Sequence, residues 1–455
     1  MQRQDKTSSV LIVFVTLLAL AIGSVAFPAP VHAASTITVT TSNDNTTTDT
    51  FCSLREAITN ANNDLATSTD CTAGSGNDTI VFADGLTPVV LGSTLPNITD
   101  TDGLTIDGGG DVTISGNDLY RILIVDNGIP LTLQNLTVAD GKVVSAIGAG
   151  IYNSGTLTIA NSTVSGHNGG LGGGIYNSGA LTIANSTVSD NISTSYGGGI
   201  SNSGTLTITN STFSGNTSGE FAGGGGIYNS GSMTITSSTF SNHTSGRGAI
   251  FNDGSPSSIT NSTFSNNSSV NDGGGGIYNQ NTLTITNSTF SGNSADAGSD
   301  IYQLSSLSTL NLYNNILANS ASGGHCEIGE GTVSGNNNLI EDASSACGFT
   351  NGVNGNIIGS DPDLGALTGS PAYFPLNSGS LAINAGNDAN CPSTDQRGVT
   401  RPQGSHCDIG VYEVTPPGAA TLISPTGDIG TNYDPTYTWN KVTESSWYQL
   451  SVSGP

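Results

Sequence analysis

Charge is scarce in this chain, and almost all of it is negative. Asp, Glu, Lys and Arg make up 9% of the 455 residues, and 34 acids stand against 9 bases. Contacts to phosphate groups need clustered Lys and Arg, so this composition argues against nucleic acid and against an anionic membrane surface as partners. Disorder is also disfavoured, because Ile, Leu, Val and Phe recur regularly among the many Gly, Ser, Thr and Asn residues.

Long apolar runs are equally scarce, since only one is present. It covers about residues 10–27, follows two basic residues and precedes the small-residue pattern Val31-His32-Ala33. This arrangement predicts a cleaved signal peptide, with an uncleaved membrane anchor as the alternative. We therefore expect a secreted or cell-surface protein. It would meet a membrane only through this segment or through a C-terminal anchor that the chain lacks.

Cysteine is rare and never occurs as Cys-x-x-Cys, which argues against a zinc site. Several pairings of the six cysteines are formally available, and the sequence-local set is the simplest. Each disulfide of that set would stabilise the fold by about 3 kcal/mol and requires an oxidising compartment, in agreement with export. The expected pairs are Cys52 with Cys71, Cys326 with Cys347, and Cys391 with Cys407.

A repeat dominates the middle of the chain. The phrases Gly-Gly-Gly-Ile-Tyr-Asn, Ser-Gly-Thr-Leu-Thr-Ile and Asn-Ser-Thr-Phe-Ser-Gly-Asn, or close variants of them, return every 23 to 27 residues. A fixed period in this range is typical of a solenoid. The Ile of the first phrase falls at Ile151, Ile175, Ile200, Ile227, Ile250, Ile277 and Ile301.

Apolar and polar residues alternate within each repeat, as in Thr156-Leu157-Thr158-Ile159. A period of two, with Thr and Ile favoured, predicts strands and argues against helical repeats. Three short strands fit into each repeat, with Gly and Asn at the turns between them. We therefore predict an all-β fold. It is a parallel β-helix with three strands per turn and internal columns of Ile, of Leu, and of Val or Phe.

Changes in composition divide the chain into five segments. Irregular strand patterns extend the solenoid on both sides of the repeat block, and Pro416-Pro417-Gly418 marks a linker. The aromatic-rich strands after the linker resemble the start of an immunoglobulin-like or fibronectin-like sandwich, which needs about 100 residues, so we expect an incomplete domain there. The expected segments are a signal peptide at 1–33, an N-terminal capping region at 34–103, the parallel β-helix at 104–365, a C-terminal segment at 366–414, and the linker with the incomplete domain at 415–455.

The capping region carries a specific motif. The run Cys-Ser-Leu-Arg-Glu-Ala begins at Cys52 and matches, letter for letter, the motif that gives the CSLREA domain its name, so this region resembles that N-terminal domain. The residues themselves predict a short amphipathic helix, with Ser53 as its N-cap and Glu56 three residues later. Such a helix, held by a disulfide between Cys52 and Cys71, would cover the first turn of the solenoid.

A second pattern lies in segment 366–414. The phrases Gly-Ser-Leu-Ala-Ile-Asn-Ala-Gly, Asp-Gln-Arg-Gly and Cys-Asp-Ile-Gly-Val-Tyr-Glu follow one another, and they resemble the choice-of-anchor Q domain of bacterial β-helix surface proteins. Asn384 stands where that family usually has Asp. The repeats are similar to those of polymorphic outer-membrane proteins. Together these resemblances cover about residues 37–413. They imply an exported surface protein with a right-handed β-helix, and they imply no defined reaction.

Chemistry is difficult to place in the repeat block. Glycosidases need a pair of carboxylates across the scissile bond, yet no two acids between residues 143 and 295 share a position in the repeat. We therefore expect no catalytic residues there. Some polysaccharide lyases and hydrolases have the same fold, so a carbohydrate-active enzyme is the alternative function. The ionisable residues concerned are Asp190, Glu220, Asp253, Asp272 and Arg247, with His167 and His243 isolated in turn regions.

The flanks of the repeat block are richer in charge. The acidic stretches 107–111 and 361–363 offer oxygen ligands for Ca²⁺, but each also fits a tight turn with solvated acids, which is the interpretation we favour. No other cofactor is expected. Arg397 and Arg401, with acids nearby, are expected to form ion pairs that hold the C-terminal cover.

One column of side chains is a candidate ligand surface. Aromatic residues recur directly after the repeated Ile. If the Ile side chains point inward, these rings point outward, where spaced rings can stack on sugars. Mutual packing that shields the solenoid wall is the alternative, and we favour it. The tyrosine column consists of Tyr152, Tyr176, Tyr228, Phe251, Tyr278 and Tyr302.

These observations predict an exported β-helix protein with a structural or adhesive role. Its expected partners are surface glycans or other cell-surface proteins. The alternative is a carbohydrate-active β-helix protein, either a polysaccharide lyase or hydrolase or a glycan-binding module. The Asn residues of the recurring Asn-Ser-Thr phrases are expected to form turns or stacked ladders.

Overall fold

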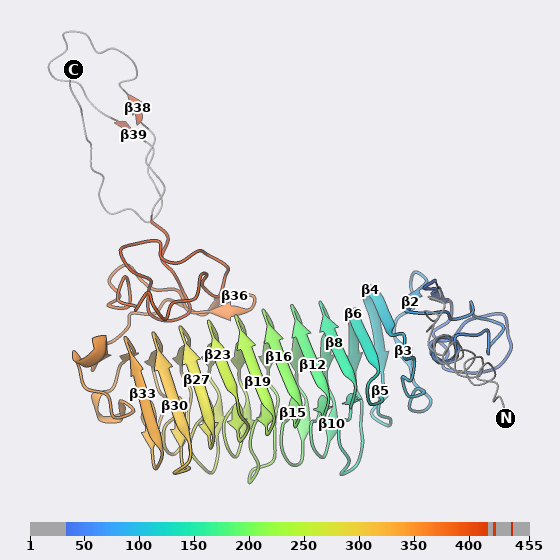
Figure 1. Cartoon of the computed structure of the whole chain (residues 1–455), viewed down its shortest axis with the longest axis horizontal. Helices are drawn as coiled ribbons and strands as arrows, with labels where there is room; N and C mark the ends of the chain where they lie inside the picture. Colours follow the sequence, from blue (N-terminus) through green and yellow to red (C-terminus); the bar gives the residue numbers. More distant parts are fainter. Residues whose placement is uncertain (1–32, 417–421, 425–437, 440–455) are drawn as a thin grey trace, which may run out of the picture.

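The computed structural model describes residues 33–416, 422–424 and 438–439. Most of this chain winds into a parallel β-helix of about 11 turns, seen as the row of arrows in Figure 1. The predicted signal peptide and nearly all of the predicted sandwich-like domain lie outside the described residues. Of that domain only β38 (Leu422–Ser424) and β39 (Thr438–Trp439) are described, and they pair antiparallel. No helix among the described residues combines the length and the apolar character that crossing a bilayer requires.

Three parallel ladders form the solenoid, and the Ile ladder begins only at β5 (Leu123–Val125), after the first turns. The Ile ladder is a 9-stranded sheet that contains the repeated Ile residues. The long ladder carries the Thr-Leu-Thr-Ile phrases and the short ladder carries the Thr-Phe-Ser phrases; both belong to one 22-stranded sheet. The prediction of three strands per turn is therefore confirmed. A fourth set of pairings, seen in several turns, adds β10 (Asn168–Gly169), β14 (Ile192–Ser193), β21 (Thr244–Ser245) and β25 (Ser268–Ser269).

The strands of the Ile ladder are β5 (Leu123–Val125), β7 (Ile151–Asn153), β11 (Ile175–Asn177), β15 (Ile200–Asn202), β18 (Ile227–Asn229), β22 (Ile250–Asn252), β26 (Ile277–Asn279), β29 (Ile301–Gln303) and β32 (Cys326–Ile328). Those of the long ladder are β1 (Thr36–Val39), β2 (Asp78–Phe82), β4 (Leu104–Ser115), β6 (Pro130–Ala139), β8 (Thr156–Ala160), β12 (Ala180–Ala184), β16 (Thr205–Thr209), β19 (Ser232–Thr236), β23 (Ser257–Thr260), β27 (Thr282–Thr286), β30 (Thr309–Tyr313) and β33 (Thr332–Asn336). Those of the short ladder are β3 (Val89–Val90), β9 (Thr163–Ser165), β13 (Thr187–Ser189), β17 (Thr212–Ser214), β20 (Thr239–Ser241), β24 (Thr263–Ser265), β28 (Thr289–Ser291), β31 (Ile316–Ala318), β34 (Leu339–Ile340) and β35 (Ile357–Ile358).

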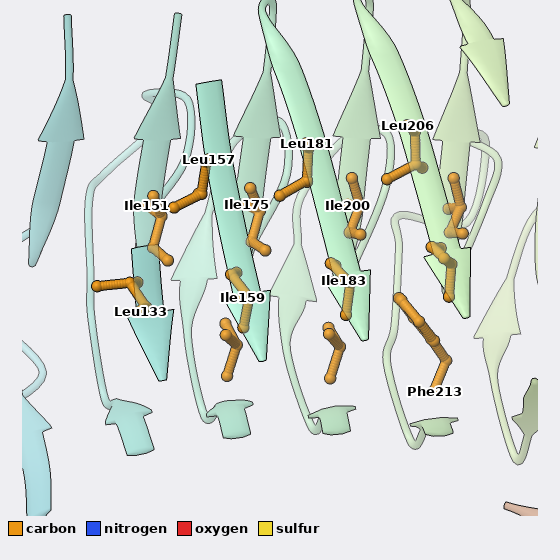
Figure 2. Close-up of a cluster of buried hydrophobic side chains, with 14 of the residues drawn as sticks. Leu133, Ile151, Leu157, Ile159, Ile175, Leu181, Ile183, Ile200, Leu206 and Phe213 are labelled. Carbon is orange, nitrogen blue, oxygen red and sulfur yellow. The ribbon is translucent and has the colours of Figure 1, made fainter. Parts of the chain in front are cut away.

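The interior is built from columns of like side chains. Parallel pairing sets Ile175 between Ile151 and Ile200 of the neighbouring turns. Figure 2 shows these side chains pointing across the interior toward Leu157 and Leu181 of the long ladder. All five are at most 1% exposed. Burying one such side chain stabilises the fold by roughly 1.5–3 kcal/mol, and each turn buries its apolar side only against its neighbours.

Amide side chains form a buried column beside the apolar ones. The Asn that ends each Ile-Tyr-Asn strand donates from Nδ2 to the Oδ1 of its counterpart one turn on. Asn202 lies 2.6 Å from Asn229, and Asn229 lies 3.0 Å from Asn252. Buried polar groups need such partners, and here the repetition itself supplies them. This asparagine column contains Asn153, Asn177, Asn202, Asn229, Asn252, Asn279 and Gln303.

The Asn residues of the Asn-Ser-Thr phrases have a different role. Asn161, Asn185 and Asn210 take φ values of 49°, 50° and 48°, in the left-handed region that Asn tolerates. They turn the chain from the long ladder into the short ladder, so the prediction of turn-forming Asn is confirmed.

The solenoid begins before the predicted boundary at residue 104. β1 pairs with β2, and β2 pairs with β4, so the first turns lie inside the predicted capping region. The sequence period is hidden there because a long excursion separates β1 from β2. The excursion contains the predicted helix, α2 (Leu54–Asn63), which begins with a reciprocal capping box between Ser53 and Glu56 and packs against β1 and β2. The predicted disulfide between Cys52 and Cys71 is present.

Segment 366–414 lies along one side of the solenoid and not over its end, as Figure 1 shows. Thr263 donates from Oγ1 to Gln396 Oε1 at 2.7 Å, and Asn261 donates to the Thr394 carbonyl at 2.7 Å. The only paired strands of this segment, β36 (Thr368–Gly369) and β37 (Ala372–Tyr373), form a small antiparallel hairpin. We call this segment the lateral cover.

Ion pairs hold the lateral cover, as predicted. Arg397 pairs with Asp395 at 2.6 Å, whereas Arg401 pairs with Glu413 at 3.6 Å. The predicted disulfide between Cys391 and Cys407 is also present. The last turns of the solenoid are closed separately, by the predicted disulfide between Cys326 and Cys347 and by the short helices η1 (Ala343–Ser345) and η2 (Val353–Gly355).

Candidate functional site

The repeat is interrupted at one position near its C-terminal end. Asp300 precedes Ile301 and His325 precedes Cys326, at a position where the six preceding turns have Gly or Ala. Because Ile301 and Cys326 pair in register, Asp300 and His325 lie on consecutive turns, one beside the other. The residues at this position in the earlier turns are Gly150, Gly174, Gly199, Gly226, Ala249 and Gly276.

An inner polar column explains why earlier turns have no large side chain at this position. Its members are His167, Asn191, Asn216, His243, Asn267 and Asn293, all at most 1% exposed. A Cβ on Gly150 would lie 2.7 Å from the His167 ring, and a Cβ on Gly174 would lie 3.1 Å from the Asn191 amide. One turn beyond Asn293 the equivalent residue is Ser320. Its smaller side chain leaves room for the carboxylate of Asp300 in the same turn.

Asp300 and His325 form a buried pair. Nδ1 of His325 lies 2.7 Å from Oδ2 of Asp300, and the two side chains are 3% and 0% exposed. Asn293 donates from Nδ2 to the other carboxylate oxygen, Oδ1, at 2.8 Å. Ser320 Oγ lies 2.6 Å from the same Nδ1. These contacts fix Nδ1 in the interior and leave Nε2 as the free edge of the ring.

Burial and neighbouring charge act in opposite directions on this pair. Burial by itself lowers the pKa of His325, but the hydrogen bond and the charge of Asp300, together with the charges of Glu341 and Asp342, outweigh it and raise the pKa above its usual 6.5. Burial raises the pKa of Asp300, against the hydrogen bonds from His325, Asn293 and Ser320. We place an imidazolium beside a carboxylate at neutral pH, because the carboxylate has hydrogen-bond donors at both oxygens.

A pocket of about 440 Å³ opens beside His325. It lies between the loop after β31 and the residues after β34, and its lining includes Ser320, Ser322, Glu341 and Asp342. Oε2 of Glu341 lies 3.8 Å from Nε2 of His325, beyond hydrogen-bond distance. The volume falls within the range of small-ligand pockets.

The geometry limits what this pocket can do. A Ser–His–Asp triad places Ser and Asp on opposite ring nitrogens, whereas Ser320 and Asp300 both contact Nδ1. In glycosidases the two catalytic carboxyl groups are about 5 Å or more apart and flank the bond, whereas the group 3.8 Å from the Glu341 carboxylate is the imidazole of His325. Among the described residues no group of three or more His, Cys, Asp or Glu is arranged to hold a metal ion. The groups that line the pocket can donate hydrogen bonds to a bound oxygen and accept hydrogen bonds from it.

The tyrosine column is largely packed against itself. Tyr152 and Tyr176 stack with ring centroids 5.6 Å apart and planes 8° from parallel. Tyr278 is 0% exposed and Phe251 4%, so these two rings offer no face to a ligand. The remaining rings are half-buried, and where Ser201 interrupts the column, Tyr196 from a neighbouring loop supplies a ring 4.7 Å from Tyr228. The buried rings pack against their neighbours, as the alternative interpretation proposed. Stacking of glycans on the half-buried rings stays a prediction.

The other predicted residues do not form a common site. Arg247 pairs with Asp272 at 3.0 Å on the next turn, and its guanidinium covers the rings of Phe251 and Tyr278. Asp107 lies within β4 and accepts hydrogen bonds from Gln134 and Asn135 of β6, so the stretch 107–111 is an irregular part of a strand and not the tight turn that we favoured.

At the second acidic stretch, Asp361 accepts from the Asp363 main chain at 2.8 Å, as a turn would. His167 and His243 are buried members of the inner polar column, and burial lowers the pKa of each to about 4.

Sequence reasoning missed Asp300 and His325. The last acid considered in the repeat block is Asp272, and Asp300 and His325 lie further along the chain. The signal was nevertheless present, because a column of Gly that changes to Asp and then to His breaks the repeat at one register position.

The outward side of the long ladder forms a further surface, the threonine face. Leu181 and Ile183 point inward, so the side chains between and beside them point outward, and the register repeats this from turn to turn. Thr156, Thr182 and Thr205 are exposed. From β8 to β33 no strand of the long ladder contains a charged residue.

Comparison with known proteins supports the fold. Residues 199–361 match the model of the right-handed β-helix region. The chain is similar to the crystal structure of pectate lyase Pel9A, with a TM-score of 0.50 and 13% sequence identity over 83% of this chain and 96% of that one. At this identity the similarity concerns the fold alone. No curated protein matches the sequence. The protein is a parallel β-helix repeat protein.

Proposed function

We propose that this protein is an exported structural and adhesive β-helix that binds neutral polysaccharide along its threonine face. The observation that carries the proposal is the uncharged series of outward side chains, mostly hydroxyl-bearing and exposed or half-buried, that the parallel register repeats from β8 to β33. Neighbouring strands lie about 4.7–4.9 Å apart, so the outward side chains recur at this interval along the solenoid. A surface that presents one kind of group at a fixed interval suits a polysaccharide, whose sugar units also present one kind of group at a fixed interval.

Charge favours a neutral polymer over an acidic one. The chain has a formal net charge of −25. An acidic polymer would therefore be repelled by the protein at distances within the Debye length. The predicted signal peptide and the resemblances of the two flanks support an extracellular role, in which polysaccharides and other surface proteins would be the partners.

Binding to insoluble polysaccharides tests the proposal. We expect the full secreted chain to be retained on cellulose or chitin and to be retained less on pectin or alginate. Replacing Thr182 and Thr207 with Lys places two charges in the middle of the threonine face and should reduce retention about tenfold or more. Ser189→Lys, on the outward side of β13, is the matched control and should leave retention unchanged. Equal retention of the parent and the double variant would contradict the proposal.

The tyrosine column provides a separate arm of the same experiment. Tyr152→Ala with Tyr176→Ala removes two half-buried rings. If this pair, and not the threonine variant, abolishes retention, the polymer lies on the tyrosine column.

A carbohydrate-active enzyme is the alternative function, and the fold shared with a pectate lyase supports it only as an analogy. Lyase action creates unsaturated ends that absorb in the ultraviolet. An increase in absorbance on incubation with pectin or alginate would favour the enzyme, and binding without any increase would favour the adhesive role.

A further inference from the structure

The pocket beside His325 contains a buried side chain that the solenoid does not fully use. The ring is held by Asp300 and Ser320 at Nδ1, but Nε2 has no hydrogen-bond partner among the described residues. Only 3% of the side chain is exposed, so the pocket is the route by which a ligand would reach Nε2. Nε2 is not fully enclosed, so a group in the pocket reaches it and supplies the hydrogen-bond partner that the described residues do not.

We propose that this pocket binds a hydroxyl group of a polyhydroxy ligand, with His325 Nε2 as the donor and Glu341 as the acceptor. The two atoms are 3.8 Å apart. One oxygen atom lying beside the line between them reaches both at about 2.8 Å, accepting from the imidazole and donating to the carboxylate. A hydroxyl group does both at once, whereas a carboxylate cannot donate and an ammonium cannot accept.

The surrounding groups narrow the class of ligand. Glu341 and Asp342 face the pocket and oppose an anionic ligand, and the charge of His325 opposes a cationic group at the bridging position. Ser320 and Ser322 add two hydroxyl groups to the lining. A neutral saccharide fits this set. The proposal goes beyond the proposed function, because the pocket is formed by the loops after β31 and β34 and does not involve the threonine face.

The experiment follows the imidazole signals of the full chain by nitrogen-15 NMR during titration with oligosaccharides. The probes are three neutral tetrasaccharides (cellotetraose, maltotetraose and galactotetraose), anionic tetragalacturonate and cationic tetraglucosamine. The His325 signals are those missing from the His325→Gln variant. We expect at least one neutral probe to shift the His325 Nε2 signal saturably, and both charged probes to bind about tenfold more weakly or not at all.

Variants separate this pocket from other surfaces. Glu341→Ala removes an acceptor whose side chain is 32% exposed, and with it the hydrogen bond that Oε2 accepts from the Asn319 main-chain N–H at 2.6 Å. It should weaken binding about tenfold while the solenoid stays folded. His406→Gln, which changes an exposed His paired with Asp388 on the lateral cover, is the control and should change nothing. The Thr182→Lys, Thr207→Lys variant should also leave the His325 shift intact, so the proposed function can fail without this proposal failing.

Three results would overturn the proposal. The first is that no neutral probe shifts the His325 signal, which would mean that the pocket holds only water. The second is that Glu341→Ala binds the neutral probe as tightly as the parent does. The third is that tetraglucosamine is the one probe that binds. If His325→Gln does not fold, the parent and Glu341→Ala titrations still decide the question, with the signals assigned by elimination from the other His variants.

Discussion

Asn293 donates from Nδ2 to Oδ1 of Asp300 at 2.8 Å, so the inner polar column ends on a carboxylate. Earlier in the column, Asn191 donates to Asn216 and Asn267 donates to Asn293, each at 2.9 Å. At the last member the acceptor changes from an amide to an acid, whose second oxygen is then available to His325. A structural column thereby places a charged pair at the edge of a pocket.

The buried histidines of the inner polar column should make the protein sensitive to acid. Burial lowers the pKa of His243 to about 4, below its unfolded value near 6.5. The unfolded state therefore binds more protons between these values, and stability falls as the pH is lowered from about 6.5 to 4, by up to about 3 kcal/mol for this group. We expect His243→Asn to show a smaller loss in chemical denaturation between pH 7.5 and 4.5, because Asn fits the same column. An unchanged loss would place the acid sensitivity elsewhere.

The charge of Asp300 should govern the ionisation of His325. Asp300→Asn preserves the shape of the side chain but removes the charge that raises the pKa of His325, so the pKa should fall in an NMR titration. The stabilisation from this pair is fully present below pH 6.5 in the parent and is lost as the pH rises through the folded pKa. The same pKa in both proteins would show that Glu341 and Asp342 dominate instead.

The asparagine column should be intolerant of a gap. Asn229→Ala removes one acceptor of Asn202 and one donor to Asn252, both fully buried. Asn202 keeps the carbonyls of Gly204 and Ser232, and Asn252 keeps the Ser257 hydroxyl. The hydrogen bonds lost to these two neighbours contribute about 0.5–1.5 kcal/mol each, so we expect a loss of about 2 kcal/mol in the free energy of unfolding. Thr207→Ala, on the outward side of β16, serves for comparison and should change stability by about 0.5 kcal/mol or less.

The lateral cover should depend on Arg401. This buried side chain donates to the carbonyls of Asp408 and Gly410 at 2.6 and 2.7 Å and pairs with Glu413. Arg401→Met leaves these acceptors unsatisfied, so we expect faster hydrogen exchange across segment 366–414 and unchanged exchange in the solenoid. The comparison variant is Arg247→Met, which changes a partly exposed pair on the solenoid. Equal exchange in parent and Arg401→Met would show that the disulfide and the remaining contacts hold the cover alone.

The sequence by itself determined the repeating unit of this protein. Alternation of Leu157 and Ile159 with Thr residues fixes strands with one apolar side, and the common spacing of the repeated Ile fixes the stacking of turns. The helix that begins after Ser53 and the three local disulfides were predictable for the same reason. Each rests on residues close in sequence or on a strict period, so the backbone geometry of a few residues is sufficient.

Only the tertiary structure decided where the irregular parts lie. Loop lengths between turns vary, so it was the assembled solenoid that set Asp300 beside His325, laid segment 366–414 along the side, and joined β1 to the first turn. The rings of Phe251 and Tyr278 are identical in pattern to those of Tyr152 and Tyr176, yet they are buried and the others are half-buried. That difference comes from neighbouring loops, whose contacts no local pattern specifies.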